Sequence, residues 1–473
     1  MRRFLYLSPF FPPMTRVGAL RPLKFARHLP AFGWAPVVLC DLRAGDSVDR
    51  RLGEAVPNST IVVRDYSRQT IPASDRATSP TQPSPVASPR PRTPAQRRAD
   101  KPGRRRLSAE DINPLGAHAF GIAHALRAAR ACLRAHPSCE AIVVNADPYA
   151  AMIVGTKLAA ETGLPLIHDL RDPWSCCELR RGLRPAIQRA VVDRVERRAV
   201  EAAAAVILNT ETALRDYRRH YSDLDPGRFT CIRNHADAAL IAAARPESKS
   251  TPVAAPFTPF AVLFMGNFRR FVEGAAILEA LALLRAEGLG ADQLRLVITG
   301  AVPEALWAQA EALGVADMIG DHPFVPYVEV GPLMARAQLL LSFSHPTAQR
   351  IPAKIYDYLA SDRPLLVIAE NPELRDLLER AGGASVHPHA DVQGIAATIA
   401  AAHADHARAL ELDPALSTRP AADRAVRGSR RALGLDSITA SGALAQLLDD
   451  ACGATHTIPR GGPRPPAPEP THG

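Results

Sequence analysis

The sequence of 473 residues contains no run of about eighteen consecutive apolar residues, so we expect no helix that crosses a bilayer. Its seven cysteines include no Cys-x-x-Cys pair, and no zinc-ligand spacing surrounds the adjacent Cys176 and Cys177. Prolines at positions 9, 12 and 13 interrupt the apolar patch near the N-terminus, and no signal-peptide cleavage site follows. These absences predict a cytoplasmic protein without a disulfide framework or a metal cluster.

The positive charge of the chain is concentrated in one segment. Residues 67–106 contain ten arginines or lysines and two aspartates, a net +8 of the total +9, which leaves the rest nearly neutral. The segment also holds eight prolines and no apolar periodicity, so we predict a disordered insertion that contacts anionic lipid or another polyanion. The nearly neutral remainder is not expected to bind nucleic acid. Residues 453–473, with six prolines, are predicted to form a disordered tail.

Short apolar runs alternate with helical patterns along the remaining sequence, which predicts an α/β protein with parallel, doubly wound sheets. Residues 242–259 lose this periodicity and are rich in Pro, Ser and Thr, so they are predicted to link two domains. The expected strands are Phe4–Leu7, Pro36–Cys40, Ala141–Asn145, Leu166–Asp169, Ala205–Leu208, Phe260–Met265, Leu294–Thr299, Leu339–Phe343 and Leu365–Ile368.

The helix expected at 180–203 is amphipathic. Its apolar stripe consists of Leu183, Ile187, Val191 and Val195, and many of the other positions are arginines. We expect the stripe to pack against a sheet and the arginines to face solvent; contact with a membrane surface is the alternative.

The stretch 344–370 places a short helix between two of the expected buried strands. Pro352 suits the first turn of this helix, because its missing N–H costs nothing there. The helix N-terminus then lies at the carboxyl edge of the sheet, where free backbone N–H groups attract phosphate. Lys354 would meet a diphosphate and Asp357, one turn on, the hydroxyls of a ribose. An ordinary amphipathic helix with both side chains in solvent is the other interpretation.

This stretch resembles the donor-site signature of glycosyltransferase family 4, whose members are retaining enzymes of the GT-B fold. The family carries two glutamates eight residues apart, and Gln349 and Asp357 stand at the matching positions. Pro352 and Lys354 match a Pro-x-Lys that one branch of the family has before the second acid. The resemblance implies that Gln349, Lys354 and Asp357 bind the donor. Because Gln349 lacks the charge of the family's glutamate, it affects which sugar the donor carries more than it affects the class of donor.

The resemblance extends over most of the chain outside the insertion and the tail. It implies two Rossmann-like domains that face each other across a cleft. They are an acceptor-side domain at 1–66 and 107–241 and a nucleotide-sugar domain at 260–434, with a terminal helix at 435–452 that packs back on the first domain.

Basic residues after the first strand of the second domain contact the donor diphosphate in this family. Here Gly266, Arg269 and Arg270 follow the strand expected at 260–265. The resemblance therefore adds these three residues to the donor site.

Charged residues also follow the strand expected at 166–169, so they emerge at the carboxyl edge of the first sheet. The sequence from Asp169 through Arg171 and Asp172 to Trp174 resembles a motif of the family branch that builds surface polysaccharides. The resemblance assigns Asp169, Arg171 and Asp172 to catalysis on the acceptor side of the cleft. From the residues alone, Asp172 could instead cap a helix, with Trp174 packed beneath it.

Arg16 and Gly18 lie in a Pro-rich loop after the first expected strand. The loop resembles the first loop of family 4 enzymes, where a small residue lets the backbone approach ligands in the cleft. The alternative is that Gly18 ends a loop before a helix.

The sequence therefore predicts a glycosyltransferase that moves a sugar from a nucleotide-diphosphate donor to a growing glycan or a lipid-linked acceptor. Retention of anomeric configuration is implied by the resemblance. We expect no metal or other cofactor, and we expect peripheral contact with an anionic membrane. A nucleotide-sugar 2-epimerase of the same fold and a non-catalytic sugar-binding protein of this fold are the alternatives.

Overall fold

The structure is a computed structural model of the full chain. It describes residues 1–43, 45–67, 119, 121–146, 148–177, 181–182, 184–242, 256–268, 271–323, 325–344, 347–361, 363–412 and 433–456. The insertion predicted at 67–106, the linker at 242–259 and the tail at 453–473 lie mostly outside these residues, and Arg269 and Arg270 lie wholly outside them.

The N-terminal domain is built on a seven-stranded sheet in the order β3-β2-β1-β4-β5-β6-β7, in which all neighbours are parallel. The order reverses between β1 and β4, which opens a crevice at their carboxyl ends. The strands are β1 (Arg2–Leu7), β2 (Trp34–Cys40), β3 (Ile61–Arg64), β4 (Cys139–Asn145), β5 (Leu166–Leu170), β6 (Ala205–Leu208) and β7 (Phe229–Cys231).

The C-terminal domain has a six-stranded parallel sheet in the order β10-β9-β8-β11-β12-β13. This is the Rossmann order, and it reverses between β8 and β11. The strands are β8 (Phe260–Met265), β9 (Leu294–Thr299), β10 (Ile319–Asp321), β11 (Leu339–Phe343), β12 (Leu365–Ile368) and β13 (Ala384–His387).

The structure confirms the predicted α/β class with two doubly wound parallel sheets. All nine predicted strands are present, and they occupy the interior of the two sheets. The four strands that the sequence did not indicate, β3, β7, β10 and β13, are the four edge strands. An edge strand has a neighbouring strand on one side only, and the four edge strands here are three or four residues long. They therefore lack the apolar run that marks a central strand.

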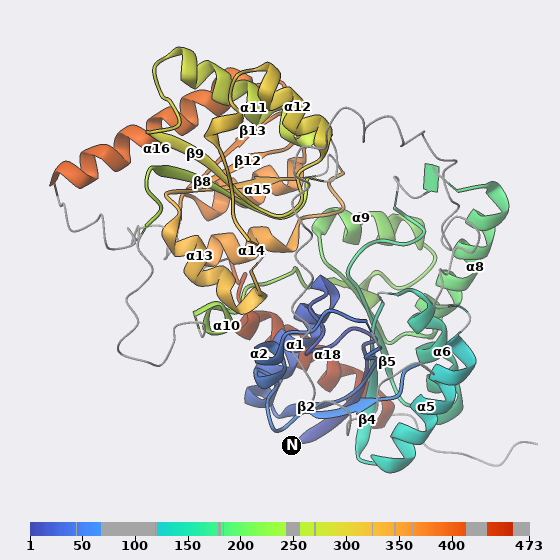
Figure 1. Ribbon diagram of the computed structural model, residues 1–473. Coiled ribbons are helices and arrows are strands. Elements are labelled where there is room, and N and C mark those ends of the chain that lie inside the picture. Colours follow the sequence, from blue (N-terminus) through green and yellow to red (C-terminus); the bar gives the residue numbers. More distant parts are fainter. Residues whose placement is uncertain are drawn as a thin grey trace, which may run out of the picture.

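Helices cover both faces of each sheet (Figure 1). In the N-terminal domain α1 and α18 pack on one face and α5 and α6 on the other. In the C-terminal domain α11 and α16 cover one face and α14 and α15 the other. The α-helices are α1 (Leu20–His28), α2 (Arg50–Glu54), α5 (Ile122–Ala135), α6 (Ala150–Thr162), α8 (Ala186–Ala202), α9 (Glu211–His220), α10 (Ala238–Ala242), α11 (Phe271–Ala286), α12 (Glu304–Ala312), α13 (Val330–Arg336), α14 (Ala353–Ala360), α15 (Pro372–Ala381), α16 (Val392–Leu412) and α18 (Ser437–His456).

The prediction for the amphipathic helix is wrong in its orientation. Ile187 is 77% exposed and Val191 is 42% exposed, so among the described residues of the expected stripe only Val195 packs, in part, against the core. The buried face of α8 instead carries Val192, Ala199 and the carboxylate of Glu196. Because the core position is held by a charged residue, the apolar pattern indicated the wrong face.

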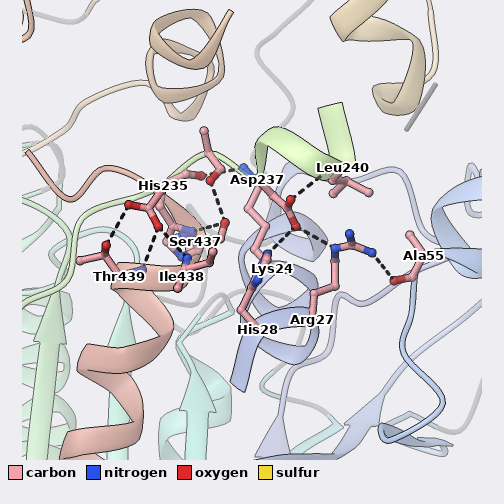
Figure 2. Close-up of polar contacts among 12 residues, drawn as sticks. Lys24, Arg27, His28, Ala55, His235, Asp237, Leu240, Ser437, Ile438 and Thr439 are labelled. Atoms are coloured by element: carbon pink, nitrogen blue, oxygen red, sulfur yellow. Dashed lines mark hydrogen bonds and ion pairs between the residues drawn. The ribbon is translucent and has the colours of Figure 1, made fainter. Parts of the chain in front are cut away.

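The chain returns to the N-terminal domain through α18, and two crossover segments, 233–237 and 433–437, run side by side between the domains. The Ala236 amide donates to the Leu435 carbonyl oxygen at 3.0 Å, and the Ser437 amide donates to the Ala236 carbonyl oxygen at 2.9 Å. Figure 2 shows Asp237 anchoring this region to α1 by accepting from Arg27 at 2.7 Å. Burial alone would raise the pKa of Asp237, but hydrogen bonds from His28, Leu240 and Arg27 hold it well below its usual range.

Candidate functional site

The predicted donor residues of the C-terminal domain lie where its strand order reverses, between β8 and β11. Gly266 follows β8 directly, and Lys354 stands in the first turn of α14. The Lys354 ammonium donates to the Met265 carbonyl oxygen at 2.9 Å and lies 4.4 Å from the centroid of the Phe264 ring. The structure thus brings Gly266 and Lys354 together beside the N-terminus of α14.

Two glycines allow the backbone to come close at this corner. Gly266 has a φ of +149°, and a Cβ added to it would lie 2.6 Å from Lys354 Nζ. At Gly300, directly after β9, an added Cβ would lie 2.3 Å from the carbonyl oxygen of Gly266. The ends of β8 and β9 therefore approach too closely for a side chain. Sequence reasoning missed Gly300, although a glycine at the end of a buried strand is a signal for such an approach.

Asp357, the predicted ribose-binding residue, is 5% exposed. Its Oδ1 atom accepts from Lys24 Nζ at 3.1 Å and from the Tyr327 hydroxyl at 3.0 Å. Tyr327 belongs to the C-terminal domain, whereas Lys24 belongs to α1 of the N-terminal domain. Burial and the nearby carboxylate raise the pKa of Tyr327, so its hydroxyl remains a donor. Sequence reasoning missed both partners, which are far from Asp357 in the chain.

Gln349 and Arg350 connect the two domains. Gln349 Nε2 donates to the Cys176 carbonyl oxygen at 2.8 Å and to a carboxylate oxygen of Asp216 at 2.6 Å. Arg350 Nε donates to the Asp172 carboxylate at 2.8 Å, and a second bond makes this ion pair bidentate. The hydrogen bonds with Asp172 raise the pKa of Arg350. In this structure Gln349 therefore binds the acceptor-side domain.

Asp169 forms a buried ion pair at the end of β5. Arg21 Nε and Nη2 donate to its two carboxylate oxygens at 2.8 and 2.9 Å, and both side chains are at most 4% exposed. Arg21 also donates to the carbonyl oxygens of Ile232 and Arg233. Asp169 thus lies inside the N-terminal domain, while Arg171 lines a cavity between the domains.

Packing of Trp174 and hydrogen bonds from Tyr149 hold the acceptor-side loop, residues 171–177, in place. Trp174 is fully buried, and its ring stacks on Tyr149 with the centroids 4.7 Å apart. The Tyr149 hydroxyl donates to the carbonyl oxygens of Asp172 and Pro173 at 3.2 and 3.1 Å. No helix begins at Asp172 within residues 171–177, so the capping alternative is not supported.

A second anchor of this loop comes from α8. The Ser175 amide donates to Glu196 Oε2 at 2.9 Å, and the hydroxyls of Tyr217 and Tyr221 donate to the same carboxylate. Burial raises the pKa of Glu196 above its ordinary value. A charged residue at a core position of α8 is therefore explained by the loop that it holds, and sequence reasoning missed it.

A small cavity of about 20 Å³ lies between the domains, with room for little more than one water molecule. It brings together Arg171 and Asp357 from the predicted site. Gly18 is buried next to the lining residue Val17, and the Arg16 side chain, 59% exposed, lies 5.0 Å from the centroid of the Phe10 ring. The cavity is lined by Val17, Leu20, Arg21, Lys24, Arg171, Asn234, His235, Ala353 and Asp357.

Solved structures of similar shape identify this arrangement. Sucrose-phosphate synthase from Thermosynechococcus elongatus aligns over 96% of this chain and 100% of its own, with 14% identity and a TM-score of 0.61. HepE from Anabaena in complex with UDP aligns over 95% of this chain and 100% of its own, with 16% identity and a TM-score of 0.55. The chain has the GT-B fold. Neither a protein-family model nor a curated protein matches it.

A third GT-B neighbour comes from a different class of enzyme. A putative UDP-N-acetylglucosamine 2-epimerase from Listeria monocytogenes aligns over 96% of this chain and 97% of its own, with 10% identity and a TM-score of 0.50. At such identities the similarity shows the GT-B fold, and the chemistry has to be argued from the residues in the cleft.

The described residues of the GT-B scaffold can also be searched for a metal-binding cluster and for a membrane-spanning helix. Among the described residues, no three His, Cys, Asp or Glu side chains gather in a way that could hold a metal ion. None of the described helices combines the length and the apolarity needed to span a bilayer.

Proposed function

We propose that this protein is a retaining glycosyltransferase that moves a sugar from a nucleotide-diphosphate sugar to a growing glycan or glycolipid. The observation that carries the proposal is the meeting of Gly266 and Lys354 at the N-terminus of α14, with Asp357 one turn further along that helix, at the reversal point of a Rossmann-ordered sheet. Such a point is where open α/β sheets bind nucleotides. We propose further that the protein belongs to the branch of family 4 that carries a Pro-x-Lys donor motif.

On the donor side, the Lys354 ammonium and the first amides of α14 meet the diphosphate, where they stabilise the charge that develops as it leaves. Asp357 accepts hydrogen bonds from the ribose hydroxyls. Gly266 lets the diphosphate approach the backbone, and Arg269 and Arg270 add positive charge from the segment after it. These cations and amides serve the role that a metal would otherwise fill, so the proposal includes no metal cofactor.

On the acceptor side, Arg171 and Asp172 contact the incoming glycan at the cleft, while Asp169 positions Arg21 beneath them. The exposed Arg16 lies at the rim of the acceptor entrance, and the buried Gly18 lets the backbone of this loop approach the ligands. The acceptor oxygen forms the new bond to the anomeric carbon as the bond from that carbon to the phosphate oxygen breaks. The departing diphosphate takes up the acceptor's proton.

The exposed part of α8 supports a lipid-linked acceptor. Ile187 and Val191 present apolar surface, and Arg194 and Arg198 are exposed further along the same face. An apolar patch beside arginines suits the surface of an anionic membrane. Because α8 follows the acceptor-side loop in the chain, we propose that the enzyme works at the cytoplasmic face of a membrane with its cleft near the lipid.

Calorimetric titration with UDP and with uridine tests the donor site. Asp357→Asn should weaken both ligands by roughly ten- to a hundredfold, because it removes a charge-assisted hydrogen bond to the ribose. Lys354→Met should weaken UDP and leave uridine almost unchanged. Lys157→Met, an exposed lysine on α6, is the matched control. If both donor-site variants bind both ligands as the wild type does, the proposed donor site is wrong.

The second candidate is a nucleotide-sugar 2-epimerase, because a putative enzyme of that class from Listeria shares the GT-B fold. An epimerase converts its nucleotide-sugar without an acceptor and needs acid–base groups at the sugar C2. Turnover of a UDP-sugar to its epimer in the absence of any acceptor would support this candidate over transfer.

A further inference from the structure

The Asp172 carboxylate is held by an arginine from the opposite domain. Arg350 Nε donates to Asp172 Oδ1 at 2.8 Å, and Arg350 Nη2 donates to Oδ2 of the same side chain. Asp172 follows β5 of the N-terminal domain, whereas Arg350 precedes α14 of the C-terminal domain. Two parallel bonds from one guanidinium fix the plane of a carboxylate as well as its position. Arg350 therefore sets the direction in which the Asp172 carboxylate faces.

The backbone of Arg350 is itself fixed within the C-terminal domain. The fully buried Asn371 donates from Nδ2 to the carbonyl oxygens of Thr347 and Arg350, at 2.9 Å in each case. Its Oδ1 atom accepts from the Leu374 amide at 3.0 Å, which caps the N-terminus of α15. After Arg350 the chain runs through Ile351 and Pro352 into α14. The arginine therefore lies on a fixed loop that leads directly into the proposed donor helix.

The ion pair leaves Asp172 able to bind a substrate. A carboxylate has about four lone-pair sites, and the two bonds from Arg350 use one on each oxygen. Each oxygen can therefore accept a further hydrogen bond from a sugar hydroxyl. The side chains of Arg350 and Asp172 are 29% and 30% exposed, so a ligand can reach the pair from solvent. The pair and a bound glycan are thus compatible.

A second exposed ion pair joins the same two domains without touching either loop. Arg51 of α2 donates from Nη2 to Glu329 Oε1 of the C-terminal domain at 2.7 Å. Neither residue belongs to the acceptor-side loop or to the segment that leads into α14. An effect that comes only from holding the domains together should therefore be common to both pairs, and an effect on the acceptor should be specific to Arg350.

We infer that Arg350 is a positioning residue for sugar transfer, which orients the Asp172 carboxylate toward the acceptor from the donor domain. The inference rests on the proposed function, in which Asp172 contacts the incoming glycan. The acceptor side of the cleft is then complete only with a residue of the donor domain. Loss of Arg350 impairs the use of the acceptor and spares the binding of the nucleotide, because the contacts of its guanidinium are made with the acceptor-side loop.

The test measures transfer kinetics of the full chain with UDP-sugars and lipid-linked glycan acceptors. It compares the wild type with Arg350→Met, Arg350→Lys, Asp172→Asn and the double variant Arg350→Met/Asp172→Asn. Arg51→Met is the matched control, because it removes the other interdomain pair. Hydrogen–deuterium exchange of the peptide covering residues 171–177 reports on the loop without requiring activity, and calorimetric titration with UDP reports on the donor site. Circular dichroism shows that each variant is folded, and Arg350→Lys serves if the methionine variant is not.

We expect Arg350→Met to lower kcat/KM for the acceptor by about ten- to a hundredfold, to leave UDP binding unchanged and to speed exchange in residues 171–177. Arg350→Lys should recover part of the rate, because an ammonium keeps the charge but cannot make two parallel bonds. The double variant should be no slower than Asp172→Asn alone, because Arg350 acts through Asp172. Arg51→Met should transfer sugar as the wild type does.

Three results would count against parts of this account. A further loss of rate in the double variant would overturn the inference and make Arg350 a direct ligand of the substrate. Equal effects of Arg350→Met and Arg51→Met would also overturn it, because the pair would then only join the domains. If Arg350→Met speeds exchange in the loop but the wild type transfers no sugar from any UDP-sugar, Arg350 positions the loop and the proposed function fails.

Discussion

The ion pair between Arg21 and Asp169 allows a structural role to be separated from a catalytic one. Asp169→Asn removes the charge but keeps the shape, and it leaves the Arg21 guanidinium buried without its counter-ion. Breaking a buried pair in this way costs about 3–5 kcal/mol. For a domain of this size each kcal/mol shifts the midpoint by about 2–4 °C, so we expect the midpoint to fall by roughly 6–20 °C.

Thermal unfolding followed by tryptophan fluorescence measures this loss, because Trp34 and Trp174 are both buried in the N-terminal domain. The double variant Arg21→Met/Asp169→Leu should recover much of the stability, since apolar residues often replace a buried pair at little cost. Glu161→Gln, which breaks an exposed pair, is the control and should leave the midpoint within error. A normal midpoint for Asp169→Asn combined with lost transfer would refute the structural role.

Three other predictions follow from the acceptor-side loop and the core. Asp172→Asn should lower the rate of transfer and leave UDP binding by calorimetry intact; unchanged turnover would remove Asp172 from the site. Glu196→Leu leaves the Ser175 amide and two tyrosine hydroxyls without their acceptor, at about 1–3 kcal/mol each, so the midpoint and the transfer rate should both fall, and Glu196→Gln should restore part of each. Burial lowers the pKa of His168 from 6.5 to about 3, so the unfolded chain takes up this proton first as the pH falls. Stability in urea should therefore decrease below pH 6.5 by about 1.4 kcal/mol per pH unit, and His168→Leu should flatten that slope; an unchanged slope in the variant would contradict the assignment to His168.

The sequence indicated the interior of both sheets because central parallel strands are buried on both faces and read as continuous apolar runs. The edge strand β13 has no fully buried residue, so nothing in its four residues distinguishes it from a loop. For a related reason, the sequence did not predict which face of α8 is buried. Its core position is taken by Glu196, which becomes acceptable only through partners on other elements.

Only the part of the donor site that lies in the C-terminal domain could be predicted from the sequence. Lys354 and Asp357 share one short helix next to a strand, so local pattern places them together. Lys24 and Arg350 were not predictable, because charged side chains read as exposed until a partner from another domain is known. The sequence separation between such partners exceeds a hundred residues, and only the closed arrangement of the domains brings them into contact.

The most direct test of the proposed function follows the sugar itself. UDP-sugars labelled in the sugar are incubated with the full chain, with and without lipid-linked glycan acceptors in anionic vesicles, and the label and the UDP are both measured. The proposed function predicts label in the lipid fraction, one UDP per transferred sugar, a retained anomeric configuration and dependence on the acceptor. Conversion of the donor to its epimer without an acceptor, or no turnover of any donor that binds, would contradict it.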